Sequence, residues 1–459
     1  MLSWFNESDR ELLGPGFVLL VLLLAMPLAG QDQAPAGSAP TSASAATGAD
    51  ANQAPPVLTL QDALARARSL NPQFRAAVTD AGISREDRVQ ARAALLPAVS
   101  YIAGAIYSQP NQLGEIKFIA ANGVREYISQ GIVQQSLSFA SVADYRRART
   151  AEALARSRAE IATRGLNAVV VQAYYGAIIA GRKTSNAQQA DAEAKHFLTT
   201  TRRLESGGEV AHSDAIKAQL QANDRARDLA EAKLAEEKAR LELAVLISPD
   251  FAADFSLVDD LRFAPPLPEF SEVQALAGKN NVELRAALEA LDVASKEVWV
   301  ARGGHLPALA MGYSYGLDAP QFATHTGGLR NVGYQVAATV NIPIWSWGST
   351  QSKVKRAELR RDLARVELSA AQRQAVANLK AGYGEAQLAH VQLDVLRNSA
   401  EMAADSLRLT NLRYQAGEAT ALEVLDAQNT LTQARNAYDD GEARYRLALA
   451  TLQILTGPF

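Results

Sequence analysis

The stretch from Leu309 to Leu317 places the tightest constraint on what this chain can fold into. Its even positions are small or polar, whereas its odd positions are large and apolar: Leu309, Met311, Tyr313, Tyr315 and Leu317. Because alternate side chains of a strand point to opposite faces, this pattern predicts a strand with one apolar face and one small, polar face.

A second run of the same kind follows a short Gly-rich loop. Apolar residues take the even positions from Tyr334 to Ile344, while Gln335, Thr339 and Asn341 occupy odd positions. Together the runs predict a β-hairpin over about 308–345. Because nearly all of the remaining chain has helical patterning, this hairpin needs an apolar environment on one side and water on the other.

The first 56 of the 459 residues carry signals of targeting and of a linker. The apolar run Phe17–Met26 has the length of the core of a signal peptide, so a signal peptide is expected over residues 1–30, with a buried helix as the alternative. Residues 31–56 are rich in Ala, Ser, Pro and Gln and predict a disordered leader. An apolar run of 18 residues does not occur, so a membrane-spanning helix is not predicted.

The rest of the chain is a tandem duplication. Residues 210 positions apart match in the early part of each half, and residues 209 apart match later. The pairs are Asn71 and Asn281, Arg75 and Arg285, Arg92 and Arg302, Leu96-Pro97 and Leu306-Pro307, Tyr174 and Tyr383, and Gln219 and Gln428. Chance matches do not keep one offset over half a chain, so we expect two repeats, over 57–263 and 264–459.

Each repeat is expected to contain a helix, a β-hairpin, a long helix and a shorter helix. In the first repeat the hairpin spans about 98–139, and the helices span about 141–206 and 213–247. In the second repeat the long helix spans about 349–416 and the last helix about 420–455. Capping-box spacing begins each repeat, at Thr59 with Asp62 and at Ser271 with Gln274.

The helices also carry heptad repeats, which predict lengthwise packing against neighbouring helices. One row is Leu388, Val395, Met402 and Leu409, and the other is Val424, Leu431, Tyr438, Tyr445 and Leu452. An ordinary core stripe, the alternative, predicts much shorter helices. At 1.5 Å per residue, a helix over 141–206 is about 100 Å long.

Composition excludes several classes of function. The chain has no cysteine and a net charge of −3, which excludes thiolate metal sites and a basic surface for nucleic acid. Its five histidines lack the spacing of metal ligands, so neither a metal nor a cofactor is expected. Gly312-Tyr-Ser-Tyr-Gly316 matches the motif of a hydrolase nucleophile, but it lies inside a regular strand pattern rather than a sharp turn. We therefore expect a protein that is not an enzyme.

Strands of this length match what a tilted strand needs to cross a bilayer, and open sheet edges cannot persist in hydrocarbon. One chain supplies four strands, whereas single-chain barrels start at about eight, so closure requires several subunits. Trp345 and Trp347, where the second hairpin meets its long helix, fit an aromatic girdle at the membrane interface. Core packing at that junction is the alternative.

The chain resembles the TolC-type outer-membrane efflux proteins over about residues 57–456. The resemblance rests on the duplication, the Leu-Pro entry into each hairpin, the run Asn341–Gly348 and the run Leu412–Gln428. It implies a mainly helical protomer that trimerises into a membrane β-barrel continuous with a periplasmic helical barrel. Such a channel sits in the bacterial outer membrane and passively conducts substrates delivered by a periplasmic adaptor and an inner-membrane pump of RND or ABC type.

The resemblance also assigns roles to residues. Ser213, Asp214, Tyr414, Glu423 and Asp426 are expected at the gate of the periplasmic entrance. Gly207, Gly208, Arg413 and Gly417 are expected to form the helix-tip turns and the adaptor contact. The family often has a basic latch residue where this chain has Ala419, so the latch is expected to be weaker or built differently.

Two alternatives stay open. Thr420 and Glu423 have capping-box spacing, so Glu423 serves either the helix end or the gate. A secreted periplasmic coiled-coil scaffold or adaptor without channel activity also accounts for the heptads, although not for two pairs of two-faced strands. On the channel interpretation, the five odd-numbered side chains from Leu309 to Leu317 face lipid, and Gly312, Ser314 and Gly316 face the lumen.

Overall fold

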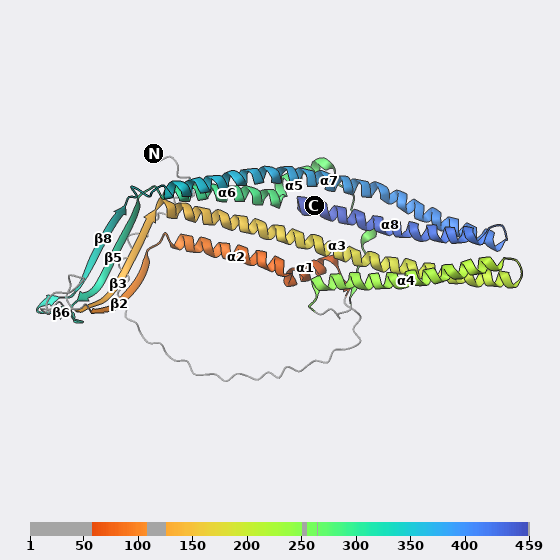
Figure 1. Cartoon of the computed structure of the whole chain (residues 1–459), viewed down its shortest axis with the longest axis horizontal. Coiled ribbons are helices and arrows are strands. Elements are labelled where there is room, and N and C mark those ends of the chain that lie inside the picture. The colour runs from red at the N-terminus through yellow and green to blue at the C-terminus, as the bar shows by residue number, and fades with distance from the viewer. Residues whose placement is uncertain (1–56, 108–124, 250–254, 264, 458–459) are drawn as a thin grey trace, which may run out of the picture. The chain divides into compact units, whose positions relative to one another are not determined.

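The computed structural model describes residues 57–107, 125–249, 255–263 and 265–457, all of which belong to one compact unit, Pro55–Phe459. The expected signal peptide and leader lie outside the described residues, as do the loop of the first hairpin and the first residue of the second repeat. Figure 1 shows the described helices and strands.

The two repeats have the same order of main elements: two short helices, a β-hairpin, a long helix and a shorter helix. The first contains β1 (Val57–Leu58), α1 (Leu60–Leu70), α2 (Pro72–Ala93), β2 (Ala98–Tyr107), β3 (Arg125–Ser138), α3 (Phe139–Ser206), α4 (His212–Ile247), β4 (Ser256–Leu257) and the 3-10 helix η3 (Leu261–Phe263). The second contains α5 (Phe270–Asn280), α6 (Val282–Gly303), β5 (Ala308–Ala319), β6 (His325–Thr326), β7 (Leu329–Arg330), β8 (Val332–Asn341), α7 (Ser349–Gln415) and α8 (Ala421–Thr456).

Strands from both repeats form a single antiparallel sheet in the order β2-β3-β5-β8. In its register Tyr313 lies opposite Val133 of β3 and opposite Val336 of β8. Residues that lie directly opposite share a face, so the apolar rows of the two hairpins merge into one apolar face. The predicted fold class, mainly helical with four strands per chain, is confirmed.

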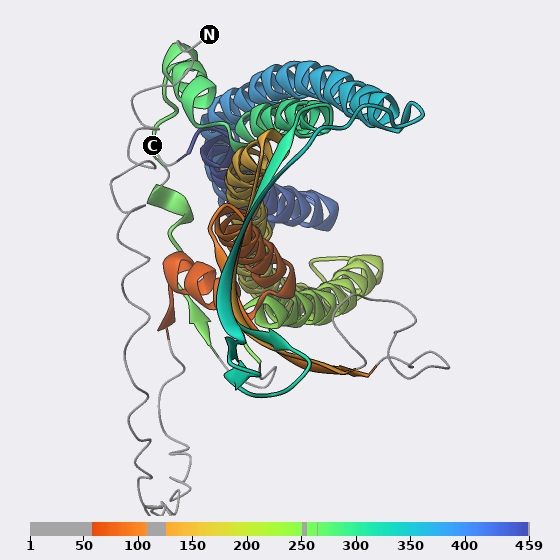
Figure 2. The same ribbon diagram turned by 90° about the vertical axis from the view of Figure 1, so that its left-hand side faces the viewer.

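The long helices α3 and α7 extend away from the sheet and carry the other helices along their lengths (Figure 1). Near the sheet, α2 packs on α3, α3 on α6 and α6 on α7; farther away, α4 packs on α3 and α8 on α7. Seen from the sheet end, the four helices near the sheet follow one another along an arc (Figure 2). α3 also contacts α8, which joins the two repeats.

The sequence fixes where these helices begin and end. α3 begins at a capping box formed by Ser138 and Ser141, and α8 begins at a capping box formed by Thr420 and Glu423. The capping box predicted for Thr59 and Asp62 is present at α1. The one predicted for Ser271 is wrong, because α5 begins two residues earlier than an N-cap at Ser271 requires, and its N-cap is Glu269, without a side-chain capping bond.

The duplication is visible in hydrogen bonds as well as in sequence. Asn71 caps α2 by accepting from the amide of Phe74, and Asn281 caps α6 by accepting from the amide of Leu284, both at 2.9 Å. The hydroxyl of Tyr174 donates to the carbonyl of Leu58 at 3.1 Å and to that of Val258 at 2.9 Å. The equivalent Tyr383 donates at 3.1 Å to the carbonyl of Pro268, the position equivalent to Leu58.

Only one of the two predicted heptad rows is covered within the protomer. The row on α8 packs inward, with Val424, Leu431, Tyr445 and Leu452 at most 3% exposed. The row on α7 faces solvent, with Leu388, Val395, Met402 and Leu409 between 47% and 64% exposed. Among the described residues, no helix is long and apolar enough to cross a membrane.

Candidate gate at the helix tips

The turns that join α3 to α4 and α7 to α8 have the same geometry. Gly208 and Gly417 take left-handed φ values of 77° and 76°, which glycine adopts without strain. In each turn the residue after this glycine donates back to the helix, from Glu209 to the carbonyl of Leu204 at 2.9 Å and from Glu418 to that of Arg413 at 2.8 Å. These bonds satisfy carbonyls that the helix end would otherwise leave unpaired. Gly207 precedes Gly208 in right-handed conformation and caps α3.

Tyr414 joins the two tips to each other. Its side chain is 4% exposed, its ring lies 5.1 Å from that of Phe197 on α3, and its hydroxyl shares a 3.1 Å hydrogen bond with Thr201. Around these rings lie small apolar residues of all four helices of the tip, including Ala218 and Ala421. Tyr414 therefore ties α7 to α3 inside the protomer, and its ring is covered there.

Glu423 forms the capping box that its spacing predicted. Its carboxylate accepts from the backbone amide of Thr420 at 3.2 Å and from the Thr420 hydroxyl at 3.1 Å. The Arg413 guanidinium lies 3.5 Å from the other carboxylate oxygen. The backbone and side-chain hydrogen bonds of Thr420, with the charge of Arg413, lower the pKa of Glu423. The carboxylate is thus held ionised at the start of α8.

Arg413 also spans the turn where a basic residue was missing at Ala419. Its guanidinium donates to the carbonyl of Glu418 at 3.1 Å in addition to its ion pair with Glu423. The positive charge at this tip therefore comes from the last turn of α7.

Asp214 occupies the position equivalent to Glu423 but in a different setting. It is the third residue of α4, and the N-cap there is Ala211, which has no hydroxyl to share. Its carboxylate lies 3.1 Å from the ammonium of Lys217. Because this ion pair is partly exposed, it holds the carboxylate only weakly.

Ser213 and Asp426 are exposed near the same tips. Asp426 lies at the position equivalent to Lys217 and forms no ion pair with the rest of the described chain. The structure thus brings the predicted gate residues to two adjacent turns, with Glu423 and Tyr414 engaged within the protomer and Asp426 open to solvent.

The residues expected to face lipid or the membrane interface lie in and beside the sheet, away from the helix tips. Tyr313 and Tyr315 are exposed on the apolar face, Tyr313 is stacked on Tyr334 at 6.4 Å, and Leu317 is buried. Trp345 and Trp347 follow β8, are 75% and 89% exposed, and contact each other edge to face at 5.8 Å. Within the protomer neither indole is packed in a core.

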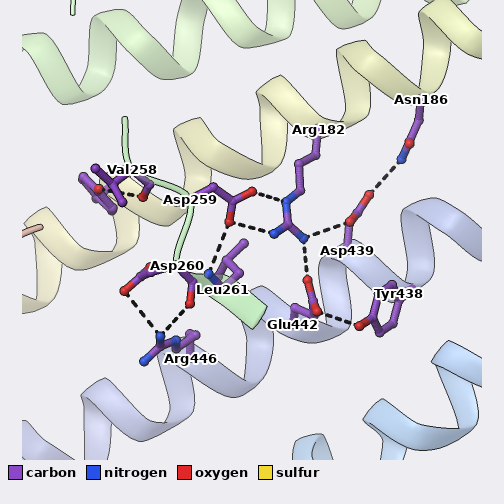
Figure 3. Close-up of polar contacts among 11 residues, drawn as sticks. Arg182, Asn186, Val258, Asp259, Asp260, Leu261, Tyr438, Asp439, Glu442 and Arg446 are labelled. Atoms are coloured by element: carbon purple, nitrogen blue, oxygen red, sulfur yellow. Dashed lines mark hydrogen bonds and ion pairs between the residues drawn. The ribbon is translucent and has the colours of Figure 1, made fainter. Parts of the chain in front are cut away.

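A cluster that the sequence analysis missed lies midway along the helices (Figure 3). Arg182 of α3 makes a bidentate ion pair with Asp259 at 2.6 and 2.7 Å, lies 3.1 Å from Asp439 of α8 and pairs with Glu442 of α8. Burial opposes the charge on Arg182, but the hydrogen bonds to Asp259 and Glu442 outweigh it and raise its pKa. Burial likewise opposes the charge on Asp259, yet bonds from Arg182 and the Leu261 amide lower its pKa.

Alongside it, Arg446 of α8 donates to the carbonyl of Asp260 at 2.7 Å. The two arginines therefore fasten the segment between the repeats to α3 and α8. At the offset of 209 the position equivalent to Arg182 is Val391, so the cluster is a place where the duplication is broken.

Comparison with known proteins agrees with this architecture. The family model described as outer membrane efflux protein matches residues 274–458. The chain is 26% identical to the outer membrane protein TolC of Vibrio cholerae, covering 85% of this chain and 88% of that protein. It is 25% identical to the alkaline protease secretion protein AprF of Pseudomonas aeruginosa, covering 84% and 82%.

Solved structures share the fold. The open state of the Neisseria gonorrhoeae MtrE outer membrane channel matches with a TM-score of 0.74 at 22% identity, covering 87% of this chain and 88% of that one. The Vibrio cholerae outer membrane protein VceC matches with a TM-score of 0.75 at 17% identity, covering 87% and 96%. With its duplicated helices, its shared sheet and its matched residues 274–458, this chain is similar to the outer membrane efflux proteins in sequence and in fold.

Proposed function

We propose that this protein is the outer-membrane channel of a tripartite efflux or type I secretion system. It passively conducts substrates from a periplasmic adaptor and an inner-membrane pump to the cell exterior. The relatives named above are outer-membrane channels and secretion proteins rather than enzymes, which supports a transport role.

The observation that carries the proposal is the sheet with two unpaired edges. Among the described strands, β2 pairs only with β3 and β8 pairs only with β5. Unpaired backbone groups cannot persist in hydrocarbon, so β8 of one copy has to pair with β2 of the next. Three copies supply twelve strands, which is within the range of closed membrane barrels. The apolar face then turns toward lipid and the small, polar face toward the lumen.

The exposed apolar rows support the same assembly. The uncovered heptad row of α7 continues to Leu412, and α4 exposes Ile216, Leu220, Leu234, Leu241 and Val245. Rows of this length on two separate helices mark an interaction surface. In a ring of copies, α7 of one protomer covers α4 of its neighbour, which buries both rows.

We assign the gate to the helix tips. Repeated by threefold symmetry, Asp214 and Asp426 form rings of carboxylates at the periplasmic entrance, which favour cations and hold a negative potential there. Ser213 lies beside them, while Glu423 and Tyr414 hold the shape of the tip. The turns with Gly207, Gly208, Arg413 and Gly417 offer the surface on which an adaptor docks.

The gate is tested with the double variant Asp214→Ala and Asp426→Ala. We expect an intact trimer whose single-channel conductance in planar bilayers is higher and whose cation selectivity is lower. Asp394→Ala is the matched control, because the Asp394 side chain is 79% exposed on α7, it pairs among the described residues with Arg397 alone, and it is far from the tip in sequence. Unchanged conductance and selectivity in the double variant would contradict the gate assignment.

The channel function as a whole is tested by fractionation with a heat-modifiability gel. An outer-membrane trimer that resists SDS until heated is expected. A periplasmic, soluble monomer is the outcome that favours a coiled-coil scaffold or adaptor without channel activity.

A further inference from the structure

We propose that α7 of one copy packs on α2 of the next, and that Arg356 and Lys355 of α7 pair there with Glu86 of α2. This inference rests on the proposed trimer and adds to it the side chains that distinguish the contact between copies from the contact inside each copy. The evidence is the duplication together with two helix faces that are left exposed by the part of the protomer that the structure describes.

The contact between the repeats inside the protomer serves as the template. α6 packs on α3, and Gly303 of α6 comes so close to Ala140 of α3 that an added Cβ would lie 2.7 Å from the Ala140 Cα. Farther along, the Thr150 hydroxyl lies 3.3 Å from the Asp292 carboxylate, and Arg285 lies 3.3 Å from Glu160. These contacts fix the register of α3 against α6.

The duplication predicts that the contact between α7 of one copy and α2 of the next has the same register as the contact between α3 and α6. α7 is equivalent to α3 at the offset of 209, and α2 is equivalent to α6 at the offset of 210. Thr150 and Asp292 therefore correspond to Leu359 on α7 and Gly82 on α2. Arg356 and Glu86 are the counterparts of Arg147 and Lys296. The same register therefore places Arg356 of one copy and Glu86 of the next at similar heights along the packed helices.

The face of α7 that this register selects is free in the protomer. Ala357 and Ala364 are buried in the structure, whereas Leu359 and Leu363 are 58% and 57% exposed. An open groove of about 380 Å³ runs along this face, and it is lined by Ser352, Lys355, Arg356, Leu359, Arg360 and Leu363. Its floor is apolar and its rim is basic, and its lining coincides with the residues that the duplication aligns with the α6-facing side of α3.

The corresponding face of α2 is also free and carries the opposite charge. Arg88 points toward α3, where its guanidinium lies 2.5 Å from the carboxylate of Glu152. Glu86 is two residues away, which turns it about 200° around the helix and away from α3. Ile83 and Val89 beside it are 54% and 46% exposed. An apolar strip with an acidic residue thus complements an apolar groove with a basic rim.

The charges are unpaired in the protomer. Within the described residues, Lys355, Arg356 and Glu86 form no ion pair, although their neighbour Arg360 lies 3.5 Å from Glu297. The internal contact has two cations at the equivalent positions, Arg147 and Lys296, and each is paired with an acid on its own helix. The contact between copies therefore has an acid, Glu86, where the internal contact has a cation, Lys296, which favours α2 over a second α6 as the partner of this face of α7.

The register is tested by disulfide trapping, for which the natural chain is suited because it contains no cysteine. In the variant with Gly82→Cys and Leu359→Cys, mild oxidation is expected to give covalent dimers and trimers on a non-reducing denaturing gel. Gly82 accepts a side chain because an added Cβ meets nothing within 4 Å. The controls are each single variant and the pair Gly82→Cys with Val376→Cys, which lies about 25 Å farther along α7. They are expected to stay monomeric on that gel.

The charge pair is tested by exchange. Glu86→Lys is expected to lower the temperature at which the SDS-resistant trimer dissociates by several degrees, and adding Arg356→Glu with Lys355→Glu is expected to restore it. Two results overturn this inference and leave the channel function standing. One is an intact outer-membrane trimer in which cysteines at positions 82 and 359 form no cross-link. The other is a trimer whose dissociation temperature, lowered by Glu86→Lys, is not restored by Arg356→Glu with Lys355→Glu. A wild-type chain that forms no trimer overturns both.

Discussion

Gly316 lies at the closest approach of two strands. An added Cβ at this position would come within 2.1 Å of the Ser129 carbonyl oxygen and 2.6 Å of the Gln130 Cα, both backbone atoms of β3. Neither can move without breaking the ladder that joins the two repeats. Gly312, four residues earlier in the same strand, has nothing within 4 Å of its Cβ position.

Gly316→Val is therefore expected to prevent assembly of the sheet. Overpacking of this kind costs about 1–3 kcal/mol even where side chains can adjust, and here only backbone is available to move. The SDS-resistant trimer should be lost or reduced to a trace in outer-membrane fractions. Gly312→Ala is the control in the same strand and should give the wild-type amount; equal loss in both variants would contradict the steric explanation.

The capping carboxylate of Glu423 predicts a pH dependence. Because its pKa is lowered in the folded chain, its stabilising effect is fully present above the ordinary value of 4.5 and is lost as the pH falls through the lowered value. Glu423→Gln should speed hydrogen exchange of the first amides of α8 at neutral pH, and the difference from wild type should vanish in acid.

Glu418→Gln provides the comparison for this experiment, because Glu418 is exposed in the same turn and lies outside the capping box. The Glu423 variant could instead exchange the first amides of α8 faster than wild type by the same factor at neutral and at acid pH. That result would show that the charge of the Glu423 carboxylate does not stabilise the helix end.

A few ion pairs and hydrogen bonds connect α3 to α8 in a region of small side chains. Arg182 has three acidic partners, because its guanidinium pairs with Asp259 from the segment between the repeats and with two acids of α8. The side chains of Arg182, Asp439 and Glu442 are at most 15% exposed. Water therefore screens this group of charges only partly.

Arg182→Met should destabilise the protomer by about 3 kcal/mol, because three carboxylates lose their shared cation in a mostly buried site. The expected result is a clear drop in the thermal transition of the detergent-solubilised protein followed by circular dichroism. Arg435→Met is the matched control, since its ion pair with Glu193 spans 3.8 Å between partly exposed groups and contributes at most about 1 kcal/mol. Similar drops in both variants would mean that the cluster has no special role.

At the scale of the whole molecule, the described residues leave a long apolar row of α7 exposed. The exposed row of α7 repeats every seven residues, as a surface that packs against another helix does. Val395→Asp is expected to abolish the trimer without unfolding the monomer, because Val395 is 62% exposed there. Native mass spectrometry in detergent should report monomers. Gln387→Asp adds a negative charge at an exposed position of α7 about 100° around the helix from the row, and it should leave trimers intact.

Several elements of the fold could be predicted from the sequence alone. Alternation from Leu309 to Leu317, an offset of 210 or 209 between the halves and a capping box at Thr420 are local or periodic signals. They sufficed for the strands of the sheet and for the start of α8, whereas the capping box predicted at Ser271 does not form. The family resemblance led us to expect the residues of the proposed gate at the two tips. These signals can be read without knowledge of the tertiary structure. Each depends on residues that are close in sequence or on the equivalent segment of the other repeat.

Other features were decided only by the tertiary structure. The pairing of β3 with β5, the burial of Tyr414 against α3 and the sharing of Arg182 among three acids bring together residues far apart in the chain. The two heptad rows also look alike in sequence, yet one is covered by its own protomer and the other is not. Periodicity determines that a helix face is apolar; which partner covers that face depends on how the helices are arranged in space.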